Sequence, residues 1–184
     1  MKASNLKLAL AAALTILVCA HAQGSAGAQA RKPGAGRRAP RFEDYPVREV
    51  YRGPVARVRL DSRRARMFRT RLSEDSRTGP NFAGRYAAVV WGCGTGCAQM
   101  GLVDARTGRV FFPPVEYMDI PDLENEAERA RWFRLDSRLL RITQNYYDGA
   151  GRYTAYYYLF DGGRFRLLRK AVEQRPAPAG GTEN

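Results

Sequence analysis

Hydrophobic and polar residues alternate along residues 54–60 (PVARVRL). Val58 and Leu60 fall on one face of an extended chain, whereas Arg57 and Arg59 fall on the other. Because successive side chains of a strand point to opposite faces, this period of two predicts a strand with one buried face and one basic face.

The period lengthens to that of a helix over residues 61–75 (DSRRARMFRTRLSED). Ala65, Phe68 and Leu72 follow one another at spacings of three and four residues, so they form a narrow apolar stripe. The first two residues of the segment, Asp and Ser, are both favourable N-caps. The pattern predicts an amphipathic helix packed on a sheet, and the arginines around the stripe also make it a candidate anion-binding face.

Most of the remaining chain consists of short apolar or alternating runs separated by turn residues. Residues 84–92 (GRYAAVVWG) are nearly all apolar and predict a central strand buried on both faces. Further strands are predicted at residues 98–105, 109–112, 132–136, 138–144, 151–160 and 164–170. The sequences Asp-Gly-Ala-Gly and Asp-Gly-Gly separate the last three of these runs and favour tight hairpins.

One further helix is predicted over residues 121–133 (PDLENEAERARWF), which has a proline near its start and acidic residues in its first turns. The strand count and the short turns together predict an α+β fold. We expect mainly an antiparallel β-meander with one or two short covering helices.

The chain begins with a short basic stretch, MKASNLK, followed by an apolar run at residues 8–20. A small-x-small cleavage pattern, AHA, stands at residues 20–22, and the apolar run is too short to cross a membrane. We therefore expect residues 1–22 to be a signal peptide that directs the protein to the periplasm or the medium. A lipoprotein is not expected, because the residue before Cys19 is a valine.

Three more regions follow from composition. Residues 23–41 contain no acid and no large apolar residue, which predicts a disordered basic linker. Residues 42–170 are long enough for one hydrophobic core and predict a single globular β-rich domain. Residues 171–184 predict a disordered tail.

Cleavage after residue 22 removes Cys19 together with His21, the only histidine of the chain. Without histidine the mature protein has no Ser-His-Asp triad, no Cys-His pair and no histidine metal ligand. We therefore expect no catalytic residue, no metal and no cofactor, and the sequence favours a binding protein over an enzyme. Cys93 and Cys97 remain as the only cysteine pair in a compartment where disulfides persist, which predicts a bond between them.

The chain is strongly basic, with 31 Lys and Arg against 18 Asp and Glu and a net charge of +13. Within residues 48–85, eleven arginines stand against four acidic residues. Such a surface favours an anionic envelope component or another, acidic, envelope protein, and secretion argues against nucleic acid. A solvated helix face in an arginine-rich proteome is the alternative explanation. The candidate binding residues are Arg57, Arg59, Arg63, Arg64, Arg66, Arg69 and Arg71.

The stretch WGCGTGC at residues 91–97 admits three interpretations. The first is a hairpin tip closed by its own disulfide, with glycines that permit positive φ. The second is a rigid loop that contacts another protein or binds an anion through its backbone N–H groups. The third is a redox-active disulfide. The candidate contact residues of the loop are Trp91, Gly92, Gly94, Thr95 and Gly96.

Four motifs carry a resemblance to a known group of proteins. They are GPNFAGRY (79–86), WGCGTGC (91–97), LVDARTGRV (102–110) and FRLDSRLL (133–140). Together they resemble an uncharacterised family of small secreted bacterial proteins, which implies secretion and the extent of the domain but no activity. The loop is also loosely similar to the inhibitory loop of periplasmic lysozyme inhibitors. That loop carries a histidine and this one has none, so no inhibitory residue is carried over.

Two other groups of residues bear on function. Tyrosines at positions 146, 147, 153 and 156–158 are compatible with a sugar-stacking surface or with core packing. Six carboxylates are candidates for glycosidase chemistry, but those in turns also have a structural use, and no pair stands out: Asp104, Glu116, Asp119, Asp122, Asp136 and Asp161. The leading hypothesis is a non-catalytic binding module of the cell envelope. An enzyme inhibitor acting through the loop is the first alternative, and a carboxylate-based glycan hydrolase is the second.

Overall fold

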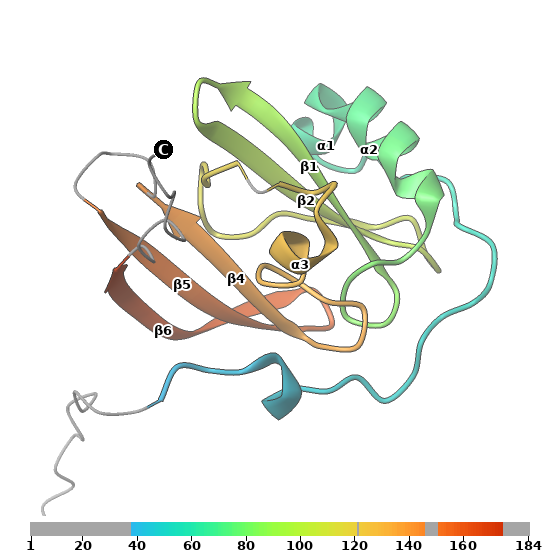
Figure 1. Ribbon diagram of the computed structural model, residues 1–184. Coiled ribbons are helices and arrows are strands. Elements are labelled where there is room, and N and C mark those ends of the chain that lie inside the picture. Colours follow the sequence, from blue (N-terminus) through green and yellow to red (C-terminus); the bar gives the residue numbers. More distant parts are fainter. Residues whose placement is uncertain (1–37, 121, 146–150, 175–184) are drawn as a thin grey trace, which may run out of the picture. The chain divides into compact units, whose positions relative to one another are not determined.

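The computed structural model describes residues 38–120, 122–145 and 151–174. The predicted signal peptide, most of the predicted linker and residues 175–184 of the predicted tail lie outside the described residues. In chain order the elements are the 3-10 helix η1 (Phe42–Asp44), α1 (Arg63–Met67), α2 (Arg69–Asp75), the 3-10 helix η2 (Ser76–Thr78), β1 (Tyr86–Gly94), β2 (Cys97–Asp104), β3 (Val110–Phe111), α3 (Glu126–Arg129), β4 (Leu139–Gln144), β5 (Arg152–Asp161) and β6 (Arg164–Gln174) (Figure 1).

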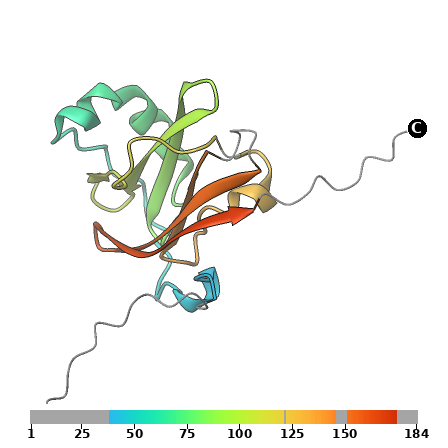
Figure 2. The same ribbon diagram turned by 90° about the vertical axis from the view of Figure 1, so that its left-hand side faces the viewer.

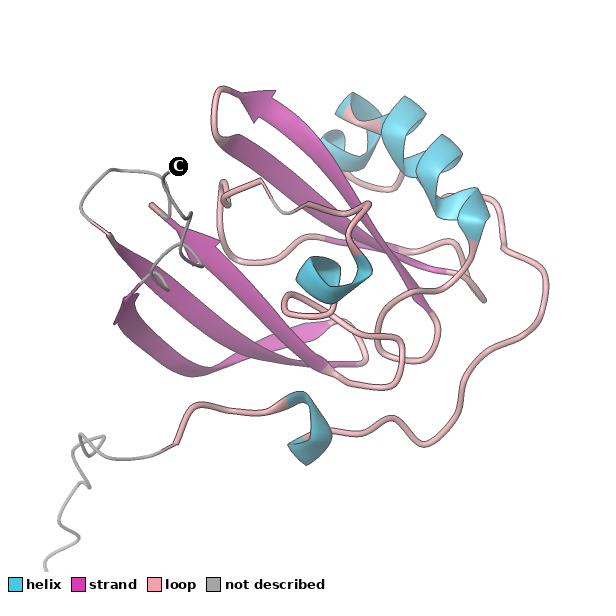
Figure 3. Cartoon of the chain, in the orientation of Figure 1, coloured by secondary structure: helices cyan, strands magenta, loops and turns pink. Residues whose placement is uncertain are grey.

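The strands form two three-stranded antiparallel sheets, ordered β1-β2-β3 and β4-β5-β6 (Figure 3). Each sheet is a meander in which consecutive strands pair through a short connection. The helices are few and short. The predicted class, an α+β fold built mainly of antiparallel strands, is therefore confirmed.

The main core joins the two sheets. Ala88 and Met100 from the first sheet and Ile142 and Phe160 from the second belong to one buried cluster, which also contains Phe82. The opposite face of the first sheet is covered by α1 and α2 (Figure 2). Successive residues of β1 alternate between these two clusters, which explains why the strand is apolar almost throughout.

A third cluster lies on the other face of the second sheet. Tyr153, Ala155 and Tyr157 of β5 pack there with the partly buried Phe42 and Tyr45 of the N-terminal segment. The segment is fixed by Ser137, whose hydroxyl donates to the carbonyls of Phe42 (2.7 Å) and Tyr45 (3.2 Å). Both faces of the second sheet are thus partly covered by protein.

The segment at residues 54–60 is extended but is not a strand, so that prediction is wrong. Its exposure alternates as expected from residue 57 onward, with Val58 and Leu60 half-buried and Arg57 and Arg59 exposed. The segment makes only two backbone hydrogen bonds to the connection between β2 and β3, from Ala56 N to Ala105 O (2.7 Å) and from Arg59 N to Gly108 O (2.8 Å). Two isolated bonds fix its course without forming a ladder.

The helix predicted over residues 61–75 is present but is interrupted at Phe68, between α1 and α2. Ser62 is the N-cap, and its Oγ accepts a hydrogen bond from Ala65 N at 3.0 Å. The predicted apolar stripe is confirmed, because Ala65 and Leu72 are buried and Phe68 is half-buried against the first sheet.

Four other predictions differ from the structure. The strand β1 is buried on both faces, as predicted, but the central strand of its sheet is β2. Residues 132–136 form a turn rather than a strand, because Trp132 and Phe133 close the end of α3 and point into the main core. The helix α3 is shorter than predicted and is capped by Asn125, whose Oδ1 accepts from Glu128 N at 3.2 Å. The strand β6 continues to Gln174, four residues beyond the predicted end of the domain.

Candidate functional site: a basic groove and a disulfide hairpin

The stretch WGCGTGC forms the tip of the β1–β2 hairpin. Cys93 and Cys97 are joined by a disulfide, with their Cα atoms 5.2 Å apart, as the sequence predicted. Gly94 pairs with Cys97 across the hairpin, so the turn itself is only Thr95 and Gly96. Gly94 has φ +143° and Gly96 has φ +68°, values that side-chain-bearing residues rarely adopt. The glycines therefore make this short disulfide-closed turn possible.

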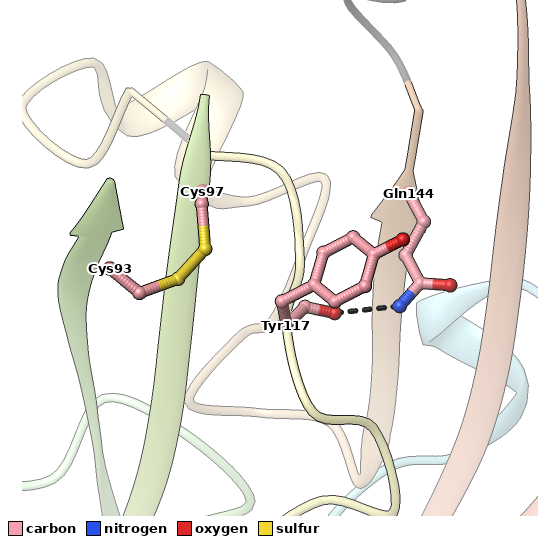
Figure 4. Close-up of a disulfide and its surroundings, with 4 residues drawn as sticks. All are labelled: Cys93, Cys97, Tyr117 and Gln144. Atoms are coloured by element: carbon pink, nitrogen blue, oxygen red, sulfur yellow. Dashed lines mark hydrogen bonds between the residues drawn. A yellow bond between two sulfur atoms is a disulfide. The ribbon is translucent and has the colours of Figure 1, made fainter. Parts of the chain in front are cut away.

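The tip of the hairpin is exposed and its base is fixed. Residues 92–96 are all exposed. Beside the base, Ala98 exchanges two backbone hydrogen bonds of 2.8 Å with Met118. The carbonyl of the neighbouring Tyr117 accepts a 2.7 Å hydrogen bond from Nε2 of Gln144, at the end of β4 (Figure 4). The hairpin is thus connected to both sheets, which limits its movement relative to the rest of the domain.

Trp91 does not share the exposure of the loop. Its side chain is only 7% exposed, and its ring centroid lies 4.5 Å from that of Phe68, at the junction of α1 and α2. We had expected Trp91 to contribute to the exposed loop contact, whereas the structure places its ring in the cluster that holds the helices on the first sheet. Trp91 therefore links the strand that carries the disulfide to the helices that carry the arginines.

The candidate arginines divide into two groups according to what their side chains contact. Arg59 forms an ion pair with Asp61 (3.1 Å). Arg64 lies over the ring of Phe112, with its guanidinium carbon 4.4 Å from the ring centroid. Arg66 donates to a backbone carbonyl, that of Leu60, at 3.0 Å. These three side chains are engaged within the domain.

Four arginines of the predicted set are exposed and form no ion pair with any carboxylate of the described residues: Arg57, Arg63, Arg69 and Arg71. The structure brings Arg57 and Arg69 together in one groove, together with a third arginine, Arg77. Arg63 and Arg71 do not line this groove. The predicted basic face is therefore not uniform, because only part of it surrounds a concave surface.

The groove has a volume of about 500 Å³ and runs between the extended segment at residues 54–60 and the helices α2 and η2. Its lining residues are Arg57, Val58, Leu60, Arg69, Thr70, Ser73, Glu74 and Arg77. The sequence does not single out Arg77, because the helix that it predicts ends at residue 75. The spacing is nevertheless a signal, since Arg69, Ser73 and Arg77 follow one another at intervals of four residues, although in the structure Arg77 lies in the 3-10 helix η2 after the end of α2.

The course of the segment that carries Arg57 depends on a glycine. Gly108 has φ +72°, and a Cβ atom at this position would collide with the backbone carbonyl of Arg57. Because Gly108 approaches the segment so closely, its carbonyl can accept the hydrogen bond from Arg59 N. The motif LVDARTGRV therefore contributes to the position of one side of the groove.

Of the six carboxylates considered for glycosidase chemistry, two are buried, Asp104 and Asp119, and four are exposed, Glu116, Asp122, Asp136 and Asp161. Asp104 is 3% exposed, and its Oδ2 lies 3.3 Å from Nε of Arg85. Its Oδ1 accepts a hydrogen bond from the backbone of Arg106 at 2.9 Å, which is the turn-forming role expected from the sequence. In the described ranges no group of three or more His, Cys, Asp or Glu side chains is arranged to hold a metal ion.

Three of the four described tyrosines that were candidates for a sugar-stacking surface are packed inside the protein. Tyr153, Tyr157 and Tyr158 are each 5% exposed. Tyr156 is half-buried and stacks on Tyr158, with the ring centroids 6.3 Å apart. Residues 146 and 147 lie outside the described part of the chain. The core-packing interpretation therefore holds for the tyrosines of β5.

A polar cluster that the sequence did not reveal connects β4, β5 and β6. Oε1 of Glu173 accepts a 2.7 Å hydrogen bond from Tyr157, and Oε2 accepts from Tyr153 (3.0 Å) and from Nη2 of Arg141 (3.1 Å). Burial by itself raises the pKa of Glu173, but the hydrogen bonds from Tyr157 and Arg141 outweigh it, so that the pKa lies below its ordinary value. Burial raises the pKa of both tyrosines. The cluster therefore holds a carboxylate, a guanidinium and two neutral hydroxyl groups.

The structure also explains the motif GPNFAGRY. The side chain of Asn81 pairs with the backbone of Ala88, accepting from its N at 2.7 Å and donating to its carbonyl at 3.3 Å. Phe82 is fully buried, and Gly84 has φ +77° in close contact with the carbonyl of Glu49. The motif thus fixes the entry of the chain into β1, which is a structural role.

No protein-family model matches this chain, and comparison with curated proteins and with solved structures gives no match. Within the described segments, no helix has the length and apolar character required to span a membrane. The interpretation of function therefore depends on the geometry of the groove and of the hairpin.

Proposed function

We propose that this chain is a secreted or periplasmic, non-catalytic binding module of the cell envelope that recognises an anionic partner through its basic groove. The observation that carries the proposal is the placement of Arg57, Arg69 and Arg77 around one concave surface, without a carboxylate partner for any of them in the described residues. Exposed guanidinium groups that are not neutralised within the protein attract anions and form paired hydrogen bonds with them.

The proposal includes a second contact through the disulfide hairpin. Residues 92–96 are exposed at a two-residue turn, and the disulfide restricts the conformations that the turn can adopt. A loop that is already ordered loses less conformational entropy on binding, so it suits a specific contact. In this proposal the groove supplies electrostatic attraction and the hairpin supplies specificity. The proposed secretion is consistent with the resemblance of four sequence motifs to an uncharacterised family of small secreted bacterial proteins.

Co-sedimentation with purified cell-envelope material at low and high salt tests the proposal. We expect the protein to bind at low salt and to lose much of its binding as salt rises, because exposed charges are screened. The variant Cys93→Ser/Cys97→Ser should retain the salt-sensitive part of binding and lose the part that persists at high salt. Absence of binding at both salt concentrations would refute an envelope-binding role.

An enzyme inhibitor that acts through the hairpin is the second candidate. It is favoured by the same exposure of residues 92–96 above a base that is bonded to both sheets. The net charge of +13 would repel basic lysozymes, so the expected target is an acidic envelope hydrolase. Inhibition of such an enzyme, abolished in Cys93→Ser/Cys97→Ser and unaffected by substitution of the groove arginines, would establish this function in place of the first.

A further inference from the structure

The lining of the basic groove is more specific than its charge. Besides three arginines it is lined by two residues that carry hydroxyl groups, Thr70 and Ser73, and by one that carries a carboxylate, Glu74. Val58 and Leu60 add an apolar surface on the side of the extended segment. A surface that attracted anions only by charge would not need the hydroxyls, the carboxylate or the apolar residues.

The number of donors favours a phosphate group over a carboxylate. Three guanidinium groups and two hydroxyls line the groove, which is more than two carboxylate oxygens can accept in good geometry. A phosphate ester presents three or four oxygens, and arginine binds two of them side by side. Arg69 and Ser73 lie one turn apart on α2, Arg77 lies in the 3-10 helix η2 that follows, and all three line the same groove, so that one phosphate group can lie between them.

The size and the remaining residues of the groove indicate that the ligand extends beyond the phosphate. A volume of about 500 Å³ is within the range of sites that hold a small organic molecule. Glu74 forms no ion pair with the groove arginines, and three arginines with one carboxylate give the lining a net charge of +2. A carboxylate beside a bound phosphate repels it, but the same carboxylate accepts hydrogen bonds from hydroxyl groups on the rest of the ligand.

We propose that the groove lined by Arg57, Arg69 and Arg77 binds the phosphate ester of a small polyol, with glycerol phosphate as its simplest form. The arginines and the hydroxyls of Thr70 and Ser73 hold the phosphate, Glu74 accepts from the polyol hydroxyls, and Val58 and Leu60 contact the carbon chain. This assignment rests on the proposed function, because it specifies the anionic partner of the same groove. The phosphate ester can belong to a lipid headgroup or to a soluble molecule.

The test is a titration of the full chain, enriched in ¹⁵N, with sn-glycerol 3-phosphate, inorganic phosphate and glycerol as separate probes. We expect shifts at the amides of Val58, Thr70 and Ser73, tighter binding of glycerol phosphate than of inorganic phosphate, and no binding of glycerol alone. Arg69→Gln and Arg77→Gln should each weaken glycerol phosphate binding about tenfold, since each removes charge-assisted hydrogen bonds.

Two variants of equal charge change serve as comparisons. Arg166→Gln changes an exposed arginine of β6, far along the chain from the groove, and should leave binding within about twofold of the unmodified protein. Arg71→Gln changes an arginine of α2 that does not line the groove. Equal weakening by Arg69→Gln and Arg71→Gln would overturn the groove assignment, because it would show that only the charge of the helix matters.

Glu74→Gln tests the recognition of the polyol. We expect it to strengthen the binding of inorganic phosphate and to reduce the preference for glycerol phosphate, because the negative charge and a strong acceptor are both lost. An unchanged preference would overturn the role of Glu74. Vesicles of phosphatidylcholine with and without phosphatidylglycerol identify the source. If the anionic vesicles occupy the groove at a lower headgroup concentration than soluble glycerol phosphate requires, the ligand is a lipid. If soluble glycerol phosphate occupies the groove at the lower concentration, the ligand is a soluble ester.

The outcomes separate this inference from the proposed function. Envelope binding that persists while glycerol phosphate leaves the groove amides unchanged would overturn the polyol phosphate assignment alone. Failure to bind any anionic envelope preparation would overturn the proposed function as well.

Discussion

Replacement of Glu173 by alanine should destabilise the domain more than replacement of any exposed glutamate. Glu173 is the shared acceptor of the cluster that joins three strands, with bonds of 2.7 Å from Tyr157, 3.0 Å from Tyr153 and 3.1 Å from Arg141. Its removal leaves the guanidinium of Arg141, whose side chain is 11% exposed, without its carboxylate. The loss therefore combines broken hydrogen bonds with an uncompensated charge.

The magnitude follows from the burial of the pair. Loss of one partner of a fully buried pair costs about 3–5 kcal/mol, and a hydrogen bond to a charged group contributes about 1.5–3 kcal/mol. The side chain of Glu173 is 24% exposed, so water can replace part of what it supplies. We therefore expect Glu173→Ala to lower the free energy of unfolding by about 2–3 kcal/mol, and Glu173→Gln, which keeps an acceptor but not the charge, by about 1–2 kcal/mol.

Urea denaturation at pH 7 measures these changes. Glu116→Ala is the matched control, because Glu116 is exposed and should alter the free energy of unfolding by less than about 0.5 kcal/mol. Tyr157→Phe, which removes the 2.7 Å hydrogen bond to Glu173 and the longer one (3.4 Å) that the hydroxyl accepts from Nε of Arg141, should cost about 1 kcal/mol. Equal unfolding free energies for Glu173→Ala and Glu116→Ala would refute the role of the cluster.

The same cluster predicts a pH dependence. The pKa of Glu173 in the folded protein lies below its ordinary value of 4.5. A carboxyl with a lowered pKa stabilises the fold above its unfolded pKa, and this contribution is lost as the pH falls through the folded pKa. The difference in stability between the unmodified protein and Glu173→Gln should therefore be constant near neutral pH and should shrink below pH 4.5. A difference that stays constant between pH 7 and pH 3 would contradict the assignment.

Three further substitutions test the frame of the site. Cys93→Ser/Cys97→Ser should lower the unfolding free energy by about 2 kcal/mol in urea titrations, because the small disulfide ring no longer restricts the unfolded chain, and unchanged stability would contradict this. Trp91→Ala should cost about 3–5 kcal/mol and loosen α1 and α2, measured by calorimetry and amide exchange, whereas a loss under 1 kcal/mol would show that the ring is not in the core. Gly108→Ala should cost at least about 1 kcal/mol in thermal unfolding, because residue 108 has a positive φ and a Cβ there would collide with the carbonyl of Arg57. Unchanged stability would contradict that close approach.

The periodicity of the chain predicted where side chains face better than how strands pair. At residues 54–60 the alternation correctly separates buried from exposed side chains, yet the segment has no strand beside it and forms only two backbone bonds with the β2–β3 connection. Pairing depends on the path of distant segments, which a local period does not contain. The apolar stripe of residues 61–75 was similarly correct, but the local period does not contain the interruption at Phe68, whose ring packs on Trp91.

Only part of the site could be predicted, because the rest depends on how distant segments pack together. The disulfide followed from composition and compartment. The burial of Trp91 could have been predicted by extending the alternation of β1 to residue 91, because Ala87, Val89 and Trp91 share one face of the strand. Arg57 and Arg69 were identified as basic surface, but their meeting in one groove depends on how the extended segment lies against α2. Glu173 and Arg141 are 32 residues apart, and nothing local to either predicts their contact.

The most direct test of the account compares two triple variants in co-sedimentation with envelope material at low salt. One replaces the groove arginines, Arg57→Gln/Arg69→Gln/Arg77→Gln, and the other removes equal charge from the second sheet, Arg152→Gln/Arg164→Gln/Arg166→Gln. We expect the groove variant to lose binding by about a hundredfold or more, and the second variant to bind within a few fold of the unmodified protein. Equal loss in the two variants would contradict the account, because binding would then follow net charge rather than the groove.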